Sequence, residues 1–335
     1  MAMTTVSIRE VAARAGVSPG TVSNVLNRPG KVAAATRERV EEAIRELGFV
    51  RHGSASTLRA GHSRTLGLSV IDIGNPFFTD VAAGVEDMAS GRGYAVILGN
   101  SAGSRAKEER NLRVLAEQRV RGVLITPTDE DLTRLDRLRE RGTRLVLVDH
   151  PAHRPDQCAV AVDDVAGGRA AVAHLLAGGA RRVAYVTGPL TIRQCRERRQ
   201  GALEALEAAG LAPDRLQVAE TTAMTARAGE KAAADLLAEG LPDAVFCAND
   251  LLALGVLRTL LQAGVRVPDD VALMGYDDID FAAASAVSLS SMRQPTYQLG
   301  RIATELLLDE CENPGAHAHQ HIMFQPELVA RESTR

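Results

Sequence analysis

After residue 64 the chain alternates short apolar runs with longer amphipathic segments, and this alternation limits the folds that are available to it. The runs have the length of buried strands and fall at Leu66–Ile73, Tyr94–Leu98, Gly122–Thr126, Arg144–Val148, Val183–Thr187, Leu216–Ala219, Ala244–Ala248 and Val271–Gly275. Helical segments such as Arg105–Gln118 and Gly168–Leu176 separate them. This pattern is typical of parallel sheets with helices on both faces. Eight units in two sets of four predict an α/β body with two similar lobes.

The first 50 residues show a different pattern, that of three short helices. Ser7 is expected to cap the first helix, which ends at Gly16. Ser18 is expected to cap the second, with Pro19 at its first position, and Thr36 to open the third. Two short helices joined by a tight glycine-containing turn form a helix-turn-helix. We therefore predict a small all-α headpiece in front of the α/β body.

Charge is distributed unevenly along the chain. Residues 1–62 hold nine Lys/Arg and five Asp/Glu, a net charge of +4, so with −3 for the whole chain the remainder carries −7. A basic head on an acidic body indicates that the head binds a polyanion, although charge alone fits a solvated surface as well. The polar stretch 51–63 has one large apolar side chain, Leu58. It predicts a linker with a short helix near 54–60 that needs a partner to become ordered.

Several classes of protein are disfavoured. The sequence has no apolar run of about 18 residues and no signal-peptide pattern, so we expect a cytoplasmic protein without a membrane partner. It lacks the phosphate-loop, nucleophile-elbow and dinucleotide patterns, so we expect neither an enzyme nor a cofactor. The alternating His317, His319 and His321 would share one face of a strand and could bind a metal. A solvated edge strand explains them equally well, and we predict no metal site.

Polar side chains follow several of the predicted strands, at the sheet edge where α/β proteins bind ligands. They include Asn75, Asp149, Asn249, Asp277 and, after a later run, Gln294. Carboxylate, amide and guanidinium groups suit the vicinal hydroxyls of a sugar, and the Phe77–Phe78 pair could cover its ring. The alternative is that Asn75 begins a helix and that both phenylalanines belong to the core.

The whole chain resembles the lactose/galactose repressor family of bacterial transcription regulators. The resemblance rests on these motifs in this order: Ile8-Arg9-Glu10-Val11-Ala12, Gly16-Val17-Ser18, Thr21-Val22-Ser23-Asn24-Val25-Leu26-Asn27, Thr36-Arg37, Ala248-Asn249-Asp250, Gly275-Tyr276-Asp277-Asp278 and Leu328-Val329-Ala330-Arg331-Glu332-Ser333. It implies a DNA-binding headpiece over 1–50, a hinge with a hinge helix over 51–63, and a body over 64–335 like periplasmic sugar-binding proteins. Lobe one would span about 64–162 and 293–322, and lobe two about 163–292 and 323–335. The family usually acts as a dimer on a palindromic operator, and a tetramer stays open.

For DNA binding, the resemblance makes residues 18–26 the recognition helix. The residues that it places at the DNA are Ser7, Ser18, Pro19, Gly20, Thr21, Ser23, Asn24, Asn27, Lys31 and Leu58. Pro19 and Gly20 replace the long polar side chains of relatives, so direct base readout rests on Asn24 and Thr21, with main-chain contacts as a further source left open. Leu58 matches a leucine that enters the minor groove at the operator centre.

For the effector, the resemblance points to Asn75, Phe77, Phe78, Asp149, Arg198, Asn249, Asp277 and Gln294. His150, beside Asp149, could be another contact, and Met224 completes the expected set. Met224 stands where some relatives carry a stacking aromatic ring. Two carboxylates beside one arginine disfavour a phosphorylated ligand, because like charges repel strongly in a desolvated cleft. We therefore expect a small unphosphorylated sugar, with control by a purine or a phosphocarrier protein as the alternative.

Overall fold

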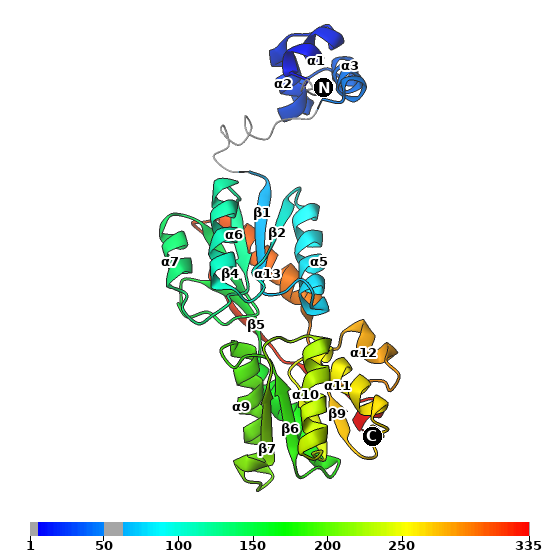
Figure 1. The fold of residues 1–335 in the computed structure, drawn as a ribbon. Coiled ribbons are helices and arrows are strands. Elements are labelled where there is room, and N and C mark those ends of the chain that lie inside the picture. The colour runs from blue at the N-terminus through cyan, green and yellow to red at the C-terminus, as the bar shows by residue number, and fades with distance from the viewer. Residues whose placement is uncertain (1–5, 50–62, 335) are drawn as a thin grey trace. The chain divides into compact units, whose positions relative to one another are not determined.

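A computed structural model describes residues 6–49 and 63–334 of the chain. The chain divides into two compact units between Ser63 and Arg64, a headpiece and a body, and each is described by itself. The helix predicted near 54–60 and Leu58 lie outside the described residues. Figure 1 shows the two units, the headpiece helical and the body α/β.

The headpiece consists of helices α1 (Ile8–Ala15), α2 (Pro19–Asn27) and α3 (Ala34–Leu47), with a short 3-10 turn at Pro29–Lys31. Two of the predicted caps are confirmed. The Ser7 hydroxyl accepts the amide of Glu10, whose side chain bonds back to Ser7, and the Ser18 side chain accepts the amide of Thr21. Such reciprocal capping satisfies amides that a helix start leaves unpaired.

The third helix begins earlier than predicted. Thr36 lies inside its first turn, and Ala33 takes the cap position without a side-chain hydrogen bond. The two alanines ahead of Thr36 have the highest helix propensity of any residue, which lets the helix extend by two positions. Gly48, at φ 62°, ends it in the left-handed conformation that glycine adopts without strain.

The headpiece buries a small core between its three helices. Its fully buried members are Val11, Ala12, Ala15, Val22, Val25, Val40 and Ala43. An ion pair of 2.6 Å between Arg14 and Glu46 adds a surface contact between α1 and α3. The predicted helix-turn-helix is confirmed, and α2 is the helix that follows its turn.

The body contains two parallel sheets. The first has the strand order β11-β5-β4-β3-β1-β2. Its strands are β1 (Thr65–Val70), β2 (Ala95–Asn100), β3 (Gly122–Ile125), β4 (Arg144–Val148), β5 (Cys158–Val162) and β11 (His321–Phe324). The second has the order β7-β6-β8-β9, with β6 (Val183–Thr187), β7 (Leu216–Glu220), β8 (Ala244–Cys247) and β9 (Ala272–Met274). We call the first sheet with its helices lobe one and the second with its helices lobe two.

Helices cover both faces of each sheet, as the alternating pattern predicted (Figure 1). Those of lobe one are α5 (Pro76–Gly91), α6 (Arg105–Glu117), α7 (Thr133–Glu140) and α13 (Thr296–Glu312). Those of lobe two are α8 (Asp164–Ala177), α9 (Arg193–Ala208), α10 (Ala226–Glu239), α11 (Asp250–Gln262) and α12 (Asp280–Ala284). In lobe one, α5 and α13 pack together on one core while α6 and α7 pack on another. None of the helices in the described residues could cross a membrane.

The expectation of four strands per lobe is wrong for lobe one, which has six. The sequence did not predict β5, a short run of small residues, or β11, a four-residue strand with no fully buried residue. Only His321 of the three alternating histidines belongs to β11, and His317 and His319 precede it. Both extra strands adjoin segments that pass from one lobe to the other. The regular alternation of strand and helix is interrupted at these crossings.

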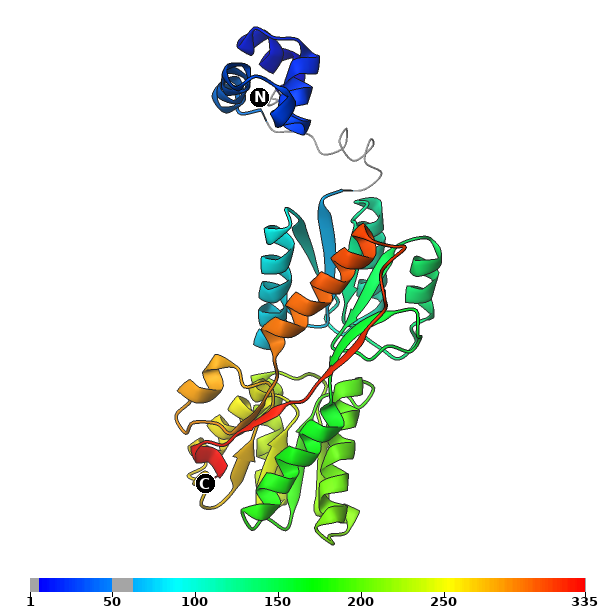
Figure 2. The same cartoon turned by 180° about the vertical axis from the view of Figure 1, so that it is seen from behind.

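Three segments connect the lobes. The chain crosses from β5 into α8, returns from β10 (Ser291–Arg293) into α13, and crosses again from β11 to β12 (Glu327–Val329). β10 and β12 pair antiparallel. Figure 2, which shows the body from behind, shows the last two crossings side by side. The carboxyl ends of the strands in both sheets consequently point toward the boundary between the lobes.

Helices α8 and α9 approach closely because each has a glycine at the contact. A Cβ on Gly168 would lie 2.1 Å from the carbonyl oxygen of Arg198, and one on Gly201 would lie 2.0 Å from that of Val165. Helix α8 also begins earlier than predicted, at Asp164, because Asp163 caps it. This contact holds Arg198 at the first half of α9, beside the lobe boundary.

We expect Gly201→Ala to destabilise the body by about 1–3 kcal/mol, since its methyl group would force two backbones apart. Gly91→Ala is the matched control, because a Cβ there would meet nothing within 4 Å. That variant should be neutral or more stable by about 0.5–1 kcal/mol. Thermal unfolding of the full chain measures both, and equal melting temperatures for the two variants would contradict the close-packing argument.

Candidate functional site

A cavity of about 40 Å³ lies where the two lobes meet. The residues that line it are Ile71, Asp72, Asn75, Phe77, Phe78, Asp149, Ile192, Gln194, Arg198, Met224, Asn249, Asp277 and Gln294. Nine of the ten residues predicted to contact an effector are among them. The tenth, His150, is buried but does not line the cavity, and its Nδ1 is 2.8 Å from the carbonyl oxygen of Pro151.

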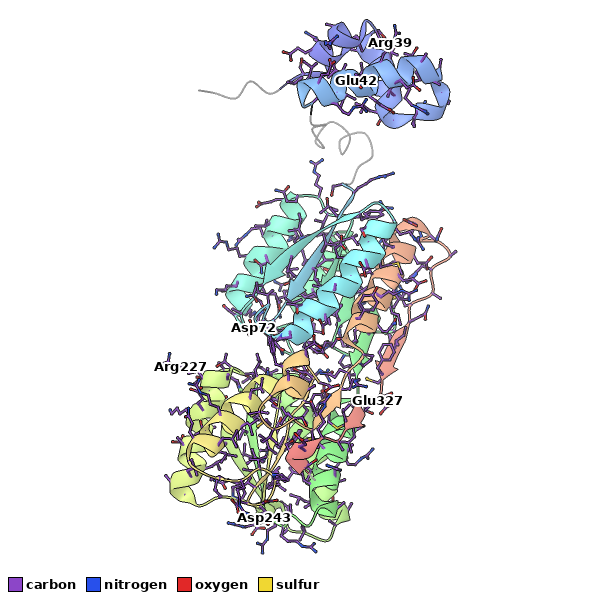
Figure 3. All side chains as sticks on the ribbon, turned by 90° about the vertical axis from the view of Figure 1, so that its right-hand side faces the viewer. Arg39, Glu42, Asp72, Arg227, Asp243 and Glu327 are labelled. Carbon is purple, nitrogen blue, oxygen red and sulfur yellow. The ribbon has the colours of Figure 1, made fainter. Side chains whose placement is uncertain are left out.

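The lobe-one wall is built at the start of α5. Asn75 caps this helix, with its Oδ1 accepting the amide of Phe77. The rings of Phe77 and Phe78 meet edge to face, with centroids 4.9 Å apart. Both rings are buried in the core of lobe one and also line the cavity, so the core reading and the cavity reading of this pair are compatible. In Figure 3, Asp72 lies at the end of lobe one that faces lobe two.

Asp277 joins the two lobes. Its Oδ2 accepts the side-chain amide of Asn75 from lobe one at 3.3 Å, and its Oδ1 accepts the amide of Gln294 at 2.7 Å. Burial raises the pKa of Asp277 to about 6 against the opposing effect of Arg198. Its backbone lies at φ 109°, a conformation that few residues other than glycine adopt. The Oε1 atom of Gln294 is buried without a hydrogen-bond partner among the described residues.

Arg198 is fixed inside lobe two. Its Nε donates to Asp164 at 2.8 Å, its Nη1 donates to the carbonyl oxygen of Ala248, and its guanidinium lies 3.6 Å from the ring centroid of Tyr276. Nη1 lies 4.0 Å from Asp277. Nη2 has no hydrogen-bond partner in the described part of the chain, so it is the donor that remains for a ligand.

Asp149 makes a second connection between the lobes. Gln194 donates its side-chain amide to the Asp149 carboxylate at 2.7 Å and to the Asp149 carbonyl oxygen at 3.0 Å. The other carboxylate oxygen, Oδ1, is buried with no partner in the described residues. Burial and the nearby Asp164 raise the pKa of Asp149 to about 7, while Arg193 and Arg198 oppose the rise.

The far wall belongs to lobe two. Asn249 caps α11 through its Oδ1 and donates its amide to the carbonyl oxygen of Met224 at 3.2 Å. The Met224 sulfur contacts Cys195 at 3.5 Å. Met224 thus places a flexible thioether in this wall, at the position where the resemblance led us to compare it with a stacking aromatic ring.

Four lining residues were missed from the sequence: Ile71, Asp72, Ile192 and Gln194. The signal for Gln194 was its place in the first turn of the helix that follows a strand. Arg193 is buried against Glu197 and Asp164, donates to the carbonyl oxygen of Asp149 at 3.3 Å, and does not line the cavity. Asp278 pairs with Arg293 and Arg331 and does not line it either.

The raised pKa of Asp149 predicts a pH dependence of stability. A carboxyl whose pKa is higher in the folded state stabilises the fold below its unfolded pKa, and this contribution is lost as the pH rises toward about 7. Asp149→Asn removes the charge and tolerates the left-handed backbone at φ 54°. We expect the variant to gain at least about 1 kcal/mol on the wild type between about pH 5 and pH 8.

Thermal unfolding of the full chain across that range measures the difference. Asp214→Asn, at an exposed aspartate, is the control and should leave the pH profile unchanged. A wild type and an Asp149→Asn variant with parallel profiles would show that the Asp149 carboxyl does not titrate as its burial requires.

In the headpiece, most of the predicted DNA contacts lie on exposed surface. Exposed are Ser7, Ser18, Pro19, Gly20, Asn24, Asn27 and Lys31, whereas Thr21 and Ser23 are half-buried. Ser18 and Thr21 share a hydroxyl–hydroxyl hydrogen bond of 2.9 Å, and Asn27 donates to the carbonyl oxygen of Ser23 at 2.7 Å. The Asn24 amide has no partner in the described residues. It is the exposed planar side chain on α2 that is left for base recognition.

Two family models match the chain. The model described as bacterial regulatory proteins of the lacI family matches residues 7–52, and a periplasmic binding protein-like domain matches residues 172–334. Among curated proteins, the HTH-type transcriptional repressor PurR of Photobacterium profundum is 34% identical, with 98% of each chain covered. The ribose operon repressor of Escherichia coli is 33% identical, with 98% of this chain and 99% of the relative covered.

Solved structures show the same likeness. A lac repressor dimer bound to operator and the anti-inducer ONPF matches with a TM-score of 0.84 at 27% identity, with 99% of each chain covered. A complex of the regulator CelR with cellobiose matches at 0.72 and 35%, covering 98% of this chain and 99% of that one. A regulator from Enterococcus faecium with bound ribose matches at 0.74 and 29%, covering 80% and 98%.

Proposed function

Because the chain belongs to the lacI family of bacterial regulatory proteins, and is a DNA-binding transcriptional repressor, we propose that a small unphosphorylated sugar in the cavity between its lobes controls its binding to a palindromic operator. Its relatives are transcriptional repressors, a role that involves no catalytic step. Members of the family bind operator DNA as dimers.

The observation that carries the proposal is the excess of acceptors at the cavity. Asp149 Oδ1 and Gln294 Oε1 are buried without donors among the described residues. Each unpaired buried acceptor costs roughly 1–3 kcal/mol, which a ligand with several hydroxyl donors would recover. The unpartnered Nη2 of Arg198 could in turn donate to a hydroxyl oxygen. A neutral polyol, which both donates and accepts, fits this set.

Charge argues against a phosphorylated ligand. The carboxylates of Asp149 and Asp277 line the cavity. A third carboxylate, that of Asp164, does not line the cavity but pairs with Arg198, which does. Arg198 already serves Asp164, so its charge is largely neutralised before any ligand arrives. A phosphate would add negative charge to a desolvated site that already holds carboxylates.

A volume of about 40 Å³ holds only a few water molecules, so a sugar, whether a monosaccharide or a longer chain, requires the lobes to move apart. Solved relatives hold ribose in one case and cellobiose in another, so the family accommodates neutral sugars of both sizes. Phe77 offers an apolar ring for the C–H face of a sugar, and Met224 offers a softer wall opposite the polar residues.

The mechanism follows from two of the hydrogen-bonded connections between the lobes, those made by side chains that line the cavity. Asn75–Asp277 and Asp149–Gln194 each join a lobe-one side chain to a lobe-two side chain. A sugar that binds these same groups changes the relative free energy of the lobe orientations. In a dimer, one orientation suits the spacing of two headpieces on an operator and another does not, which couples sugar to DNA binding.

We expect Asp277→Asn to weaken the sugar at least about tenfold, because a charged hydrogen bond contributes roughly 1.5–3 kcal/mol and the new N–H faces the amides of Asn75 and Gln294. A thermal-shift panel of neutral sugars, phosphorylated sugars and nucleobases identifies the ligand. Calorimetry then measures its affinity. Asp280→Asn, at the exposed start of α12, is the control and should bind the sugar normally.

Arg198→Ala is a poorer test, since it would leave the Asp164 carboxylate buried without its partner and destabilise lobe two. Both aspartate variants should still bind operator. Binding of a nucleobase or a phosphorylated sugar, with no response to any neutral sugar, would overturn the proposed effector class and leave the assignment as a repressor intact.

For DNA, we expect Asn24→Ala to cost about tenfold in operator affinity and to relax the base preference at one position, with no change in salt dependence. Lys31→Ala should weaken all DNA sequences alike and reduce the salt slope by about one. The operator is first selected from random DNA with the full-length protein. Gel-shift titrations at several salt concentrations compare the variants, and an Asn24→Ala variant that reads every base as before would refute its role in readout.

A further inference from the structure

A second cluster of ligand-type side chains lies away from the cavity, in lobe one. Cys158, the first residue of β5, faces His317 and His319 from the segment between α13 and β11. The Cys158 Sγ atom is 3.2 Å from His317 Nε2 and 3.6 Å from His319 Nδ1. Among the described residues, only this trio brings three histidine, cysteine or acidic side chains together with all ligand atoms within 4.8 Å of one another.

The sequence offered three alternating histidines as candidate metal ligands, and we predicted no metal site there. That arrangement is wrong, because His321 begins β11 while the other two precede the strand. Cys158, far away in the sequence, takes the third place. β5 brings it there by pairing with β11 in the register His321 with Ala159.

The distances suit a tetrahedral metal ion. With zinc–sulfur and zinc–nitrogen bonds of about 2.3 and 2.0–2.1 Å, a tetrahedral angle separates sulfur and nitrogen by about 3.6 Å. The two sulfur–nitrogen distances of 3.2 and 3.6 Å lie close to this value. A thiolate with two imidazoles is a ligand set that zinc prefers to magnesium or calcium.

A carboxylate holds His317 in the required orientation. The Nδ1 of His317 lies 2.6 Å from Asp309 Oδ2, so with the proton on Nδ1 the lone pair of Nε2 points to the Cys158 sulfur. The other oxygen of Asp309 accepts the side-chain amide of Asn313 at 2.9 Å, which fixes the carboxylate. Metal-binding histidines commonly have such a carboxylate on their second nitrogen.

Burial raises the pKa of the Cys158 thiol, and one hydrogen bond to the sulfur opposes this rise. The backbone amide of Gln320 approaches the Cys158 sulfur at 3.5 Å as a donor. Cys158 is fully buried and the His317 side chain is 2% exposed, whereas His319 is exposed.

We propose that Cys158, His317 and His319 bind a divalent metal of the zinc type, with water in a fourth position on the exposed side of His319 and with Asp309 as a positioning residue. Such an ion would tie the segment after α13 to the start of β5, which leads into one of the crossings between the lobes. Because it binds the folded state, it should raise the melting temperature of the body.

The test uses the full-length protein, stripped of metal with a chelator and titrated with Co²⁺ under reducing conditions. We expect one ion per chain, a thiolate-to-cobalt charge-transfer band in the near ultraviolet, visible bands of tetrahedral cobalt, and displacement of Co²⁺ by Zn²⁺. Zn²⁺ alone should raise the melting temperature. Saturable binding without the thiolate band, or no saturable binding, would overturn the proposal.

Variants separate ligation from general stability. His319→Gln changes an exposed side chain, so it should fold and yet weaken Co²⁺ at least about tenfold. Cys158→Ala should abolish the charge-transfer band. Asp309→Asn should weaken the metal about 10–100-fold while the tetrahedral spectrum is retained, as expected for a positioning residue.

His321→Gln is the matched control, since it lies two residues beyond His319, is exposed, and is outside the trio. It should bind Co²⁺ as the wild type does. Equal weakening in His321→Gln and His319→Gln would show adventitious binding to surface histidines and would refute the site.

Discussion

The hydrogen bonds of Asp277 are the interaction on which the rest of the site depends. One carboxylate oxygen accepts from Asn75 of lobe one and the other from Gln294, in the segment that returns from lobe two to α13. The carboxylate is buried, so these donors compensate part of the cost of removing it from water. A ligand that offers hydroxyl groups at this point competes with protein contacts that set the lobe orientation. Binding and conformation are therefore coupled through the same few atoms.

The fold positions these atoms with devices that serve the helices first. Asn75 and Asn249 each cap a helix with the side-chain oxygen, which leaves the amide nitrogen to reach another segment. Gly168 and Gly201 let α8 and α9 approach until Arg198 stands between Asp164 and the cavity. Asp149 and Asp277 both have positive φ, so strain is stored at two of the strand ends that face the cavity. Because the local structure of each lobe is rigid, a conformational change costs the least free energy at the boundary between the lobes.

Lobe one contains a second candidate site, at the edge of its sheet that β11 forms. The Cys158–His317–His319 cluster lies where β11 completes the sheet, beside the start of a crossing segment. The sugar cavity and this cluster share no residue. A metal there would act on stability, whereas the cavity would act on the orientation of the lobes. The two proposals therefore have separate readouts.

Much could be predicted from the sequence because the responsible signals are local. Ser7, Ser18 and Gly16 mark the helix-turn-helix through caps that involve only residues three or four positions away. Strand-ending polar residues such as Asn75 and Asn249 could be placed at one sheet edge, because parallel strands bring their carboxyl ends together. The motifs of the headpiece and the body identified the family. Nine of ten expected effector residues line one cavity for the same reason, and their role in binding stays a proposal.

What the sequence left open depended on contacts between distant segments. Gln194 and the unpaired oxygen of Asp149 become part of one site only because lobe two packs against lobe one. His150 follows Asp149 directly, yet it does not line the cavity, and its Nδ1 contacts the carbonyl oxygen of Pro151. Cys158 meets His317 only because β11 adds to the sheet beside β5, a pairing across 159 residues of chain. Local sequence predicted most of the helices and strands, β5 and β11 excepted, and many of the polar groups that follow the strands. Only the tertiary structure decided which of those groups meet, because side chains brought together from both lobes share no pattern along the chain.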